Sequence, residues 1–395
     1  MRTQVALLTV GDPDRVTGGY LFHRRLADAA QRHDAELRFV SIPAVPLAWA
    51  LPTGPWWLRT PVLRDADIVV LDSIAAAAAS PWLSRLRAPL VGMLHQPPGG
   101  IDSGQLARRV SARFDRWAYR RADVLMVASV WLAEQLVAGG VDRRRLRVVP
   151  PGKDPAPGDG NAGPRVGGGR EIRSRPEEQE RAAFRMGRRI AALCVANWLP
   201  RKGIAELLEA VAEMPDDVVT VHLVGDTAGG RYARRIRRRL GAPDLSRRIV
   251  VHGIVPATAV HQMYRAADVF VLPSFEEPYG TVWGEAMAGG LPVVGWRAGN
   301  LPFLADDGRE GLMATPGDVA ALAGLLERLA NDPDLRRQMG QAAAERAAGR
   351  PTWSETTARF FEVIEEVRAR RSGRARSSPR SLDPPRPTRP RTRRR

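Results

Sequence analysis

The chain contains a single cysteine, Cys194, among its 395 residues. One thiol allows no internal disulfide bond and no cysteine-cluster metal site, and so little cysteine is typical of a reducing compartment. The sequence also lacks a His-Glu-x-x-His motif, a carboxylate triplet and a Ser-His-Asp or Cys-His arrangement. We therefore expect no essential metal, no bound cofactor and no protein nucleophile of the hydrolase type.

Long uninterrupted apolar runs are absent as well. The run at 5–10 is too short for a secretory signal before the polar residues 11–14. The longest apolar stretches, 44–58 and 68–82, are broken by prolines and by Asp72, so neither provides the roughly 20 residues of a membrane-spanning helix. The sequence therefore predicts a cytoplasmic protein that crosses no membrane by itself.

Lysine is nearly absent too. Lys153 and Lys202 are the two lysines among 60 basic residues, so the chain uses arginine almost everywhere but keeps an ammonium group at Lys202. The formal net charge is +17, and the segment 372–395 holds nine arginines against one aspartate. This segment, rich in proline, serine and arginine, buries too little apolar area to order itself, so we expect a disordered tail. Such a tail suits an anionic membrane or non-specific nucleic acid binding, or is a solvated extension without a partner.

Strand-like and helical patterns alternate along two halves of the chain, which is typical of parallel sheets covered by helices. The glycine- and proline-rich stretch inside 153–189 predicts a flexible linker. The fold class is therefore α/β, with Rossmann-like domains at 1–152 and 190–350 that face each other across a cleft. A last helix at 351–371 is expected to pack back on the first domain. We expect strands at 5–10, 37–42, 68–71, 90–94, 124–128, 146–149, 190–196, 219–224, 249–251, 269–272 and 292–294.

The densest cluster of motif residues follows the expected strand 269–272 and opens a helix. The backbone amides of Gly280, Thr281 and Val282 lie where a helix start can bind a phosphate. Glu277 and Glu285, eight residues apart, can accept hydrogen bonds from a vicinal diol, while the helix amides and a cation hold a diphosphate. Together these groups describe a sugar-nucleotide site, whereas the glutamates alone can also simply cap and solvate the start of a helix.

A second cluster, 196–204, contains Arg201-Lys202-Gly203 after the first expected strand of the second domain. With this order and spacing the chain resembles the family-4 retaining glycosyltransferases of the GT-B fold, in which a basic pair with Lys-Gly and a Glu-x7-Glu motif hold the donor. Further matches lie at 149–152, 224–225, 267–274 and 290–294, so the resemblance covers about 4–370.

The resemblance implies a role for each matching residue of the second domain, which binds the donor. Lys202, helped by Arg201, neutralises the donor diphosphate as charge develops on the leaving group. Glu285 binds the ribose hydroxyls and Glu277 contacts the donor sugar. Tyr279 and the amides at the helix start complete the donor site.

The resemblance also implies that the first domain receives the acceptor. Gly18 and Gly19 correspond to the glycine loop that lets the backbone approach the donor, and His95 corresponds to a histidine near the sugar. Lys202, Glu277 and His95 are thus the expected catalytic residues.

Two positions depart from the family pattern. Asn197 stands where an arginine is common, five residues before Lys202, so either Arg201 supplies the charge or diphosphate binding is weaker. The loop Gly-Gly-x-Pro-Glu of the family corresponds here to Gly-Asn-Leu-Pro-Phe at 299–303, without the glutamate. These departures leave the donor sugar open.

The resemblance implies transfer of a sugar from a nucleoside diphosphate sugar, with retained anomeric configuration, to a glycan, lipid or small-molecule acceptor. No protein nucleophile is then required, because an oxygen of the donor phosphate can accept the acceptor's proton. Two alternatives stay open: a GT-B-fold sugar-nucleotide epimerase, and a non-catalytic protein that binds sugar nucleotides or nucleic acid.

The segment 105–121 has the pattern of a basic amphipathic helix. Such a helix can contact an anionic membrane at the inner face, or it can pack its apolar stripe on the sheet beneath a solvated arginine face. We expect the second arrangement, which is the common one for amphipathic helices. The stripe consists of Leu106, Val110, Phe114 and Trp117, and the arginines are Arg108, Arg109, Arg113, Arg116 and Arg120.

Overall fold

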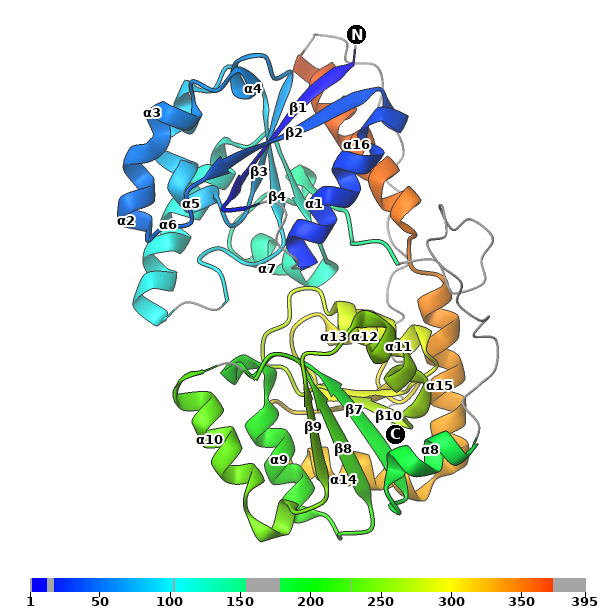
Figure 1. Cartoon of the computed structure of the whole chain (residues 1–395). Helices are drawn as coiled ribbons and strands as arrows, with labels where there is room; N and C mark the ends of the chain where they lie inside the picture. The colour runs from blue at the N-terminus through cyan, green and yellow to red at the C-terminus, as the bar shows by residue number, and fades with distance from the viewer. Residues whose placement is uncertain (1, 13–17, 102–103, 154–177, 228, 372–395) are drawn as a thin grey trace, which may run out of the picture.

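The computed structural model describes residues 2–12, 18–101, 104–153, 178–227 and 229–371. These residues form two lobes, each built on a six-stranded parallel sheet with helices on its faces (Figure 1). The predicted α/β class with two parallel-sheet domains is confirmed. The predicted disordered tail, 372–395, lies outside the described residues.

The first sheet has the strand order β2-β1-β3-β4-β5-β6. Its central strands β3 and β4 are buried at every residue, because helices cover both faces. One face packs against α1 and α16, and the other packs against α2 to α7. The strands are β1 (Thr3–Val10), β2 (Ala35–Ile42), β3 (Ile68–Asp72), β4 (Leu90–Leu94), β5 (Val124–Val127) and β6 (Leu146–Val148). The helices are α1 (Gly18–Ala29), α2 (Leu47–Ala50), α3 (Gly54–Trp57), α4 (Pro61–Arg64), α5 (Ala76–Ala79), α6 (Gln105–Arg121) and α7 (Val130–Ala138).

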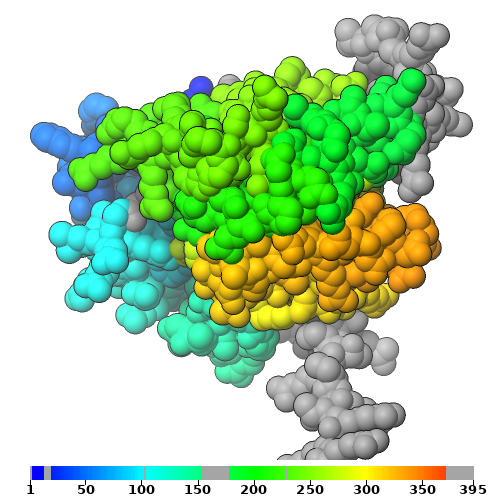
Figure 2. Space-filling view, turned by 90° about the horizontal axis from the view of Figure 1, so that it is seen from below, coloured from blue at the N-terminus to red at the C-terminus, as the bar shows by residue number. Residues whose placement is uncertain are grey.

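The second sheet has a different order, β12-β11-β10-β7-β8-β9, and a single apolar core joins it to its helices. Segments distant in the sequence meet here, since the green residues after 178 lie beside the orange residues near 340 when the molecule is seen from below (Figure 2). The strands are β7 (Ile190–Val195), β8 (Val219–Val224), β9 (Ile249–Gly253), β10 (Val269–Val271), β11 (Val293–Trp296) and β12 (Gly311–Ala314). The helices are α8 (Glu178–Arg185), α9 (Ile204–Glu213), α10 (Gly230–Leu240), α11 (Ala257–Ala266), α12 (Thr281–Ala288), α13 (Leu301–Leu304), α14 (Val319–Asn331) and α15 (Pro333–Ala348).

The predicted linker at 153–189 is too long at its carboxyl end. Its residues 154–177 lie outside the described part of the chain, but α8 is a helix that belongs to the second domain. Arg181 and Arg185 of α8 both bind the buried carboxylate of Asp268, at 2.9 and 2.7 Å. The segment resembles a linker because it has few apolar residues, and α8 is held by these ion pairs and by Phe184, which stacks on His222.

The last helix, α16 (Trp353–Arg371), returns to the first domain and packs beside α1 (Figure 1). Its Phe360 and Ile364 are buried in the same apolar cluster as Phe22 of α1. The two crossings between the domains run side by side, because the Lys153 amide donates to the Pro351 carbonyl at 2.8 Å. The first domain is therefore built from the described elements at both ends of the sequence order, β1 to β6 and α16.

The expected packing of α6 is wrong. The buried residues of α6 are Ala112, Asp115, Ala118 and Tyr119, and α6 contacts the alanine-rich helix α5. The predicted stripe faces outward instead, with Leu106 78% exposed and Trp117 38% exposed. Close helix–helix approach favours alanine at the contact, so the larger apolar side chains are left on the surface. In the part of the chain that the structure describes, no helix is long and apolar enough to span a membrane.

Candidate functional site

The strand orders locate the places where each sheet can bind a ligand. In open parallel sheets ligands bind beyond the carboxyl ends of strands where the strand order reverses. In the second sheet this point lies between β7 and β10, which neighbour each other. The loop after β7 carries Lys202 and the loop after β10 carries Glu277, so both predicted clusters arise from this one point.

The two loops are in direct contact through charged side chains. The Lys202 ammonium binds the Glu277 carboxylate, and Arg201 Nη1 lies 3.8 Å from the same oxygen, Glu277 Oε2. The side chains of all three are less than one-fifth exposed, so water screens their charges poorly. The structure thus gathers a compact cluster of two cations and one anion.

Backbone contacts hold the two loops in this arrangement. Gly203, which follows the 3₁₀ turn Pro200–Lys202, has φ +69°, and an added Cβ would lie 1.9 Å from the Pro273 carbonyl oxygen. The Arg201 carbonyl accepts hydrogen bonds from the Phe275 amide at 2.8 Å and from Ser274 Oγ at 3.0 Å. Only glycine tolerates both this backbone conformation and this close approach to Pro273. The local structure therefore requires the glycine that follows Lys202.

Arg201 is the arginine that the structure brings to the cluster. Asn197, the position where the family pattern has a basic residue, is exposed, and its Oδ1 accepts the Asp226 amide at 3.0 Å. Asn197 therefore fastens the loop after β8, while the second positive charge beside Lys202 comes from Arg201.

Helix α12 begins beside this cluster. Gly280, its N-cap, has φ +83°, and an added Cβ would meet the Trp283 ring at 2.3 Å. The first amides of α12, including those of Thr281 and Val282, have no partner within the helix and point out of its start. Glycine is thus required here by the positive φ and by the packing against Trp283, and the amides at the start of α12 are left for an anion.

Glu285 lies on the exposed face of α12, and the buried Tyr264 hydroxyl donates to its Oε2 at 3.0 Å. Burial and the nearby Glu285 carboxylate raise the pKa of Tyr264 well above its ordinary value, so the phenol stays protonated as a donor. Sequence reasoning missed Tyr264 because it comes from α11, in an ordinary helical pattern with no motif.

The loop 299–303 supports Glu277 from the other side. Gly299 has φ +56°, an added Cβ would lie 2.8 Å from the Glu277 amide nitrogen, and the Asn300 amide donates to the Glu277 carbonyl at 2.9 Å. Asn300 is buried, its Nδ2 donates to the Tyr279 carbonyl at 2.7 Å, and its Oδ1 is buried with no hydrogen bond partner. Phe303, in place of the family glutamate, is 39% exposed.

The residues around Glu277 also connect the two domains. Arg108 of α6 forms a bidentate ion pair with Glu276, at 3.0 and 2.5 Å, and Ser129 Oγ donates to the Pro278 carbonyl at 2.5 Å. The Tyr279 hydroxyl donates to the Pro151 carbonyl at 2.8 Å and accepts a hydrogen bond from Arg350. The Tyr279 hydroxyl, predicted to bind the donor, is therefore engaged in the contact between domains.

The first domain places its predicted residues at the carboxyl ends of β1 and β4. Gly18 begins α1, and an added Cβ at Gly19 would meet no heavy atom within 4 Å. His95 directly follows β4, and its Nε2 is buried without a hydrogen bond partner. Burial lowers the pKa of His95 below its ordinary value, so the ring is neutral at pH 7.

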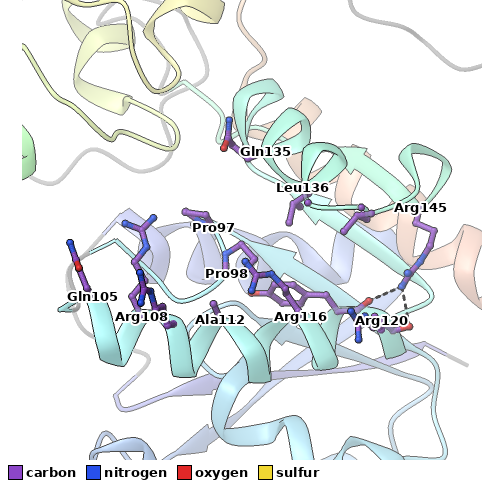
Figure 3. Close-up of a pocket in the computed structure, with 15 residues that line it drawn as sticks. Pro97, Pro98, Gln105, Arg108, Ala112, Arg116, Arg120, Gln135, Leu136 and Arg145 are labelled. Atoms are coloured by element: carbon purple, nitrogen blue, oxygen red, sulfur yellow. Dashed lines mark hydrogen bonds between the residues drawn. The ribbon is translucent and has the colours of Figure 1, made fainter. Parts of the chain in front are cut away.

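A groove of about 600 Å³ lies in the first domain between α6 and the end of α7 (Figure 3). Arg108, which reaches Glu276 across the domains, also lines this groove. Its other basic lining residues are Arg109, Arg116, Arg120 and Arg145. The sequence pattern placed Arg108, Arg109, Arg116 and Arg120 on the basic face of a helix and did not single out Arg145.

The protein has two lobes, each built on a parallel sheet, and its charged loops meet where the strand order of the second sheet reverses. This is the arrangement of a GT-B protein. Residues 175–346 match the family model "Glycosyl transferases group 1", and residues 2–152 match "Glycosyl transferase 4-like domain". The chain belongs to the family-4 glycosyltransferases of the GT-B fold.

Relatives agree with this assignment. A D-inositol 3-phosphate glycosyltransferase from Nocardia farcinica is 31% identical over 71% of this chain and 62% of its own length. One from Corynebacterium jeikeium is 31% identical over 62% of this chain and 58% of its own length. The chain spans 38% to 62% of the length of the curated relatives it matches.

Solved structures agree on the fold. A sucrose-phosphate synthase from Thermosynechococcus elongatus superposes with a TM-score of 0.76 at 21% identity, covering 93% of this chain and all of that one. The Anabaena protein Alr3699/HepE, solved in complex with UDP, superposes with a TM-score of 0.69 at 20% identity, covering 92% of this chain and all of that one. At such identities the likeness concerns the fold.

Proposed function

We propose that this protein is a retaining glycosyltransferase that transfers a sugar from a nucleoside diphosphate sugar to an acceptor bound in the first domain. The observation that carries the proposal is the cluster of Lys202, Arg201 and Glu277 beside the start of α12. A diphosphate needs cations and free amides, and a sugar needs a carboxylate; this cluster offers all of them at one point.

The proposed reaction needs no residue that becomes covalently attached to the sugar. The bond from the anomeric carbon to the donor phosphate oxygen breaks, and the acceptor oxygen bonds to that carbon on the same face. The acceptor's proton moves to a phosphate oxygen of the leaving nucleoside diphosphate. Lys202 exchanges its contact with Glu277 for the diphosphate and stabilises the negative charge that develops there.

Relatives support this choice of substrates. Alr3699/HepE has been solved with UDP-glucose, which makes a uridine diphosphate sugar the first donor to test. Several relatives are named D-inositol 3-phosphate glycosyltransferases. The arginine-lined groove between α6 and α7 favours an acceptor that likewise bears a phosphate or a carboxylate.

The test is transfer or hydrolysis by the purified chain with a panel of uridine, guanosine and adenosine diphosphate sugars. With the donor that reacts, Lys202→Ala should lower kcat/KM about a hundredfold, since losing a charged transition-state contact costs about 3 kcal/mol. Lys153→Ala is the matched control, because the other lysine binds the Ala348 carbonyl at the domain crossing. Unchanged turnover in Lys202→Ala would disprove the role assigned to Lys202. Conversion of the donor sugar into its epimer in the absence of an acceptor would indicate an epimerase.

We also propose that α6 brings the first domain to an anionic membrane. Its exposed apolar residues Leu106 and Val110 accompany arginines, and α2 and α3, which carry the exposed Trp49 and Trp56, lie on the same side of the domain (Figure 1). Exposed tryptophan and leucine with arginine is the composition of a surface that rests in the lipid headgroup region.

Vesicle co-sedimentation tests this contact. With phosphatidylglycerol vesicles we expect Leu106→Asp to reduce binding severalfold, because the substitution puts a negative charge where apolar area enters the interface. Ile254→Asp is the matched control, since Ile254 is also 78% exposed but lies in the second domain. Binding that persists in Leu106→Asp and disappears when 372–395 are deleted would assign the contact to the tail instead.

A further inference from the structure

Three side chains with metal-binding atoms meet at the carboxyl edge of the first sheet. His23 comes from α1, Asp72 ends β3 and His95 follows β4. His23 Nε2 lies 3.4 Å from Asp72 Oδ2, and one ligand atom of each residue lies within 4.8 Å of the others. The three residues are far apart in the sequence, so the fold alone brings them together.

Hydrogen bonds do not account for this cluster. Both ring nitrogens of His23 and Nε2 of His95 are buried with no hydrogen bond partner. Buried polar atoms nearly always have a partner, and an imidazole that has none costs free energy. By contrast, the Asp72 carboxylate is held in place, since Thr9 Oγ1 donates to Oδ2 at 3.0 Å and Ser73 Oγ donates to Oδ1 at 3.2 Å.

The imidazoles have the protonation state that a metal ligand needs. Burial lowers the pKa of His23 to about 4, against the weaker opposite effect of Asp72. Burial also lowers the pKa of His95. At pH 7 both rings are therefore neutral, and each has a nitrogen lone pair to donate.

We propose that His23, Asp72 and His95 bind a divalent transition-metal ion of the Zn²⁺ class. Two imidazole nitrogens and one carboxylate oxygen suit Zn²⁺, whereas Ca²⁺ and Mg²⁺ prefer oxygen ligands alone. A tetrahedral ion about 2.1 Å from each ligand separates the ligand atoms by roughly 3.4 Å. His23 and Asp72 already have this separation, and the two distances to His95, at most 4.8 Å, need to close by up to about 1.4 Å.

The hydrogen bond from Thr9 completes the proposed site. Outer hydrogen bonds orient ligating carboxylates, and Thr9 Oγ1 bonds the same oxygen of Asp72 that faces His23. The ion would fix the orientation of the His95 ring beside the cleft. It is separate from the donor diphosphate, which the proposed function assigns to the second domain, so the two proposals can fail independently.

The test measures metal binding by the full-length chain, purified without a polyhistidine tag and freed of metal with a chelator. After incubation with Zn²⁺ and desalting, we expect about one Zn²⁺ per chain by mass spectrometry. Cys194 does not compete, because burial raises the pKa of its thiol to about 12. Competition with a chromogenic chelator gives the dissociation constant, and Co²⁺ substitution gives the visible absorption of a tetrahedral site.

Three variants make the assignment specific. His23→Gln and Asp72→Asn should abolish stoichiometric retention, and Thr9→Val should weaken affinity about 10- to 100-fold. His222→Gln is the control, because the ring nitrogens of His222 contact His252 and the Phe184 carbonyl at 2.9 and 2.8 Å. Circular dichroism confirms that each variant is folded. Substoichiometric Zn²⁺ in the unmodified chain, or full retention in folded His23→Gln, would overturn the proposal.

Discussion

Single residues shape the proposed donor site in two ways. Glycines let neighbouring loops approach each other closely, and charged side chains meet where water screens them poorly. Gly203 and Gly299 stand at positions of positive φ where an added Cβ would strike the neighbouring loop. This approach brings Lys202 onto Glu277 and leaves the pair mostly buried, where a charged contact is strong but costly to leave unpaired. The pair therefore joins the two loops, and in the proposed reaction a diphosphate takes the place of the carboxylate as the partner of Lys202.

A buried histidine in the second domain should make its stability depend on pH. Burial, with a smaller effect of His252, lowers the pKa of His222 to about 4, against about 6.5 in the unfolded chain. Between pH 6.5 and 4 the unfolded state binds more protons, so the free energy of unfolding falls as the pH is lowered through this range. The loss reaches about 3 kcal/mol near pH 4 and is absent above pH 6.5.

Urea unfolding of the full chain at several pH values between 7 and 4 measures this dependence. The variant His222→Gln should show a smaller loss of stability over the same interval. His261→Gln is the control, because His261 is exposed on α11, and its profile should match that of the unmodified chain. Identical profiles for all three proteins would contradict the assignment.

Among the helices and strands, α8 and α6 show what a pattern can and cannot predict. The sequence predicted a linker where α8 forms and a buried apolar stripe on α6, yet ion pairs fasten α8, and α6 presents Leu106, Val110 and Trp117 to solvent. A helical period indicates that a helix forms, but the neighbour decides which face is buried. The same limit applies to β12, four buried residues that the sequence did not mark as a strand.

The anchoring of α8 predicts a large effect for one carboxylate. Asp268 is fully buried, and besides Arg181 and Arg185 it accepts the Ala191 amide at 2.9 Å. Asp268→Asn should lower the free energy of unfolding of the second domain by about 3 kcal/mol, because two guanidinium groups lose their partner. Urea unfolding followed by circular dichroism measures the change.

An exposed ion pair provides the comparison. Asp334 and Arg337 on α15 form an i,i+3 pair with side chains about 70% exposed. Asp334→Asn should leave the unfolding curve unchanged, since water and salt screen such pairs. Equal effects of the two substitutions would show that Asp268 does not hold α8 in place.

At the scale of the whole molecule, the first and last described elements, β1 and α16, both belong to the first domain. The return of α16 couples the domains through the paired crossings at Lys153 and Pro351. The contacts of Arg108, Ser129 and Tyr279 place the loop of Glu277 between the lobes. The position of this loop is thereby fixed by contacts with both domains.

Because α16 packs in the first domain, a substitution in α16 should destabilise the first domain although α16 follows the second domain in the sequence. Phe360→Ala should lower the free energy of unfolding of the first domain by about 4 kcal/mol, because it removes a fully buried aromatic side chain from that core. Differential scanning calorimetry should show one shifted transition and leave the transition of the second domain in place. Phe303→Ala, at a position 39% exposed, should cause little change. A shift of the second-domain transition by Phe360→Ala would contradict this division.

The sequence by itself determined the α/β class, the two domains, nearly every strand and the two charged loops that carry Lys202, Glu277 and Gly280. These features are local, because a strand, a Lys-Gly loop and the start of a helix each depend on the types of a few adjacent residues. Only the tertiary structure decided which residues meet. It placed Tyr264 on Glu285, Asn300 under Glu277, and His23 beside Asp72 and His95. Such pairs join segments distant in the chain, and the packing that brings them together leaves no periodic or motif signal in a single sequence.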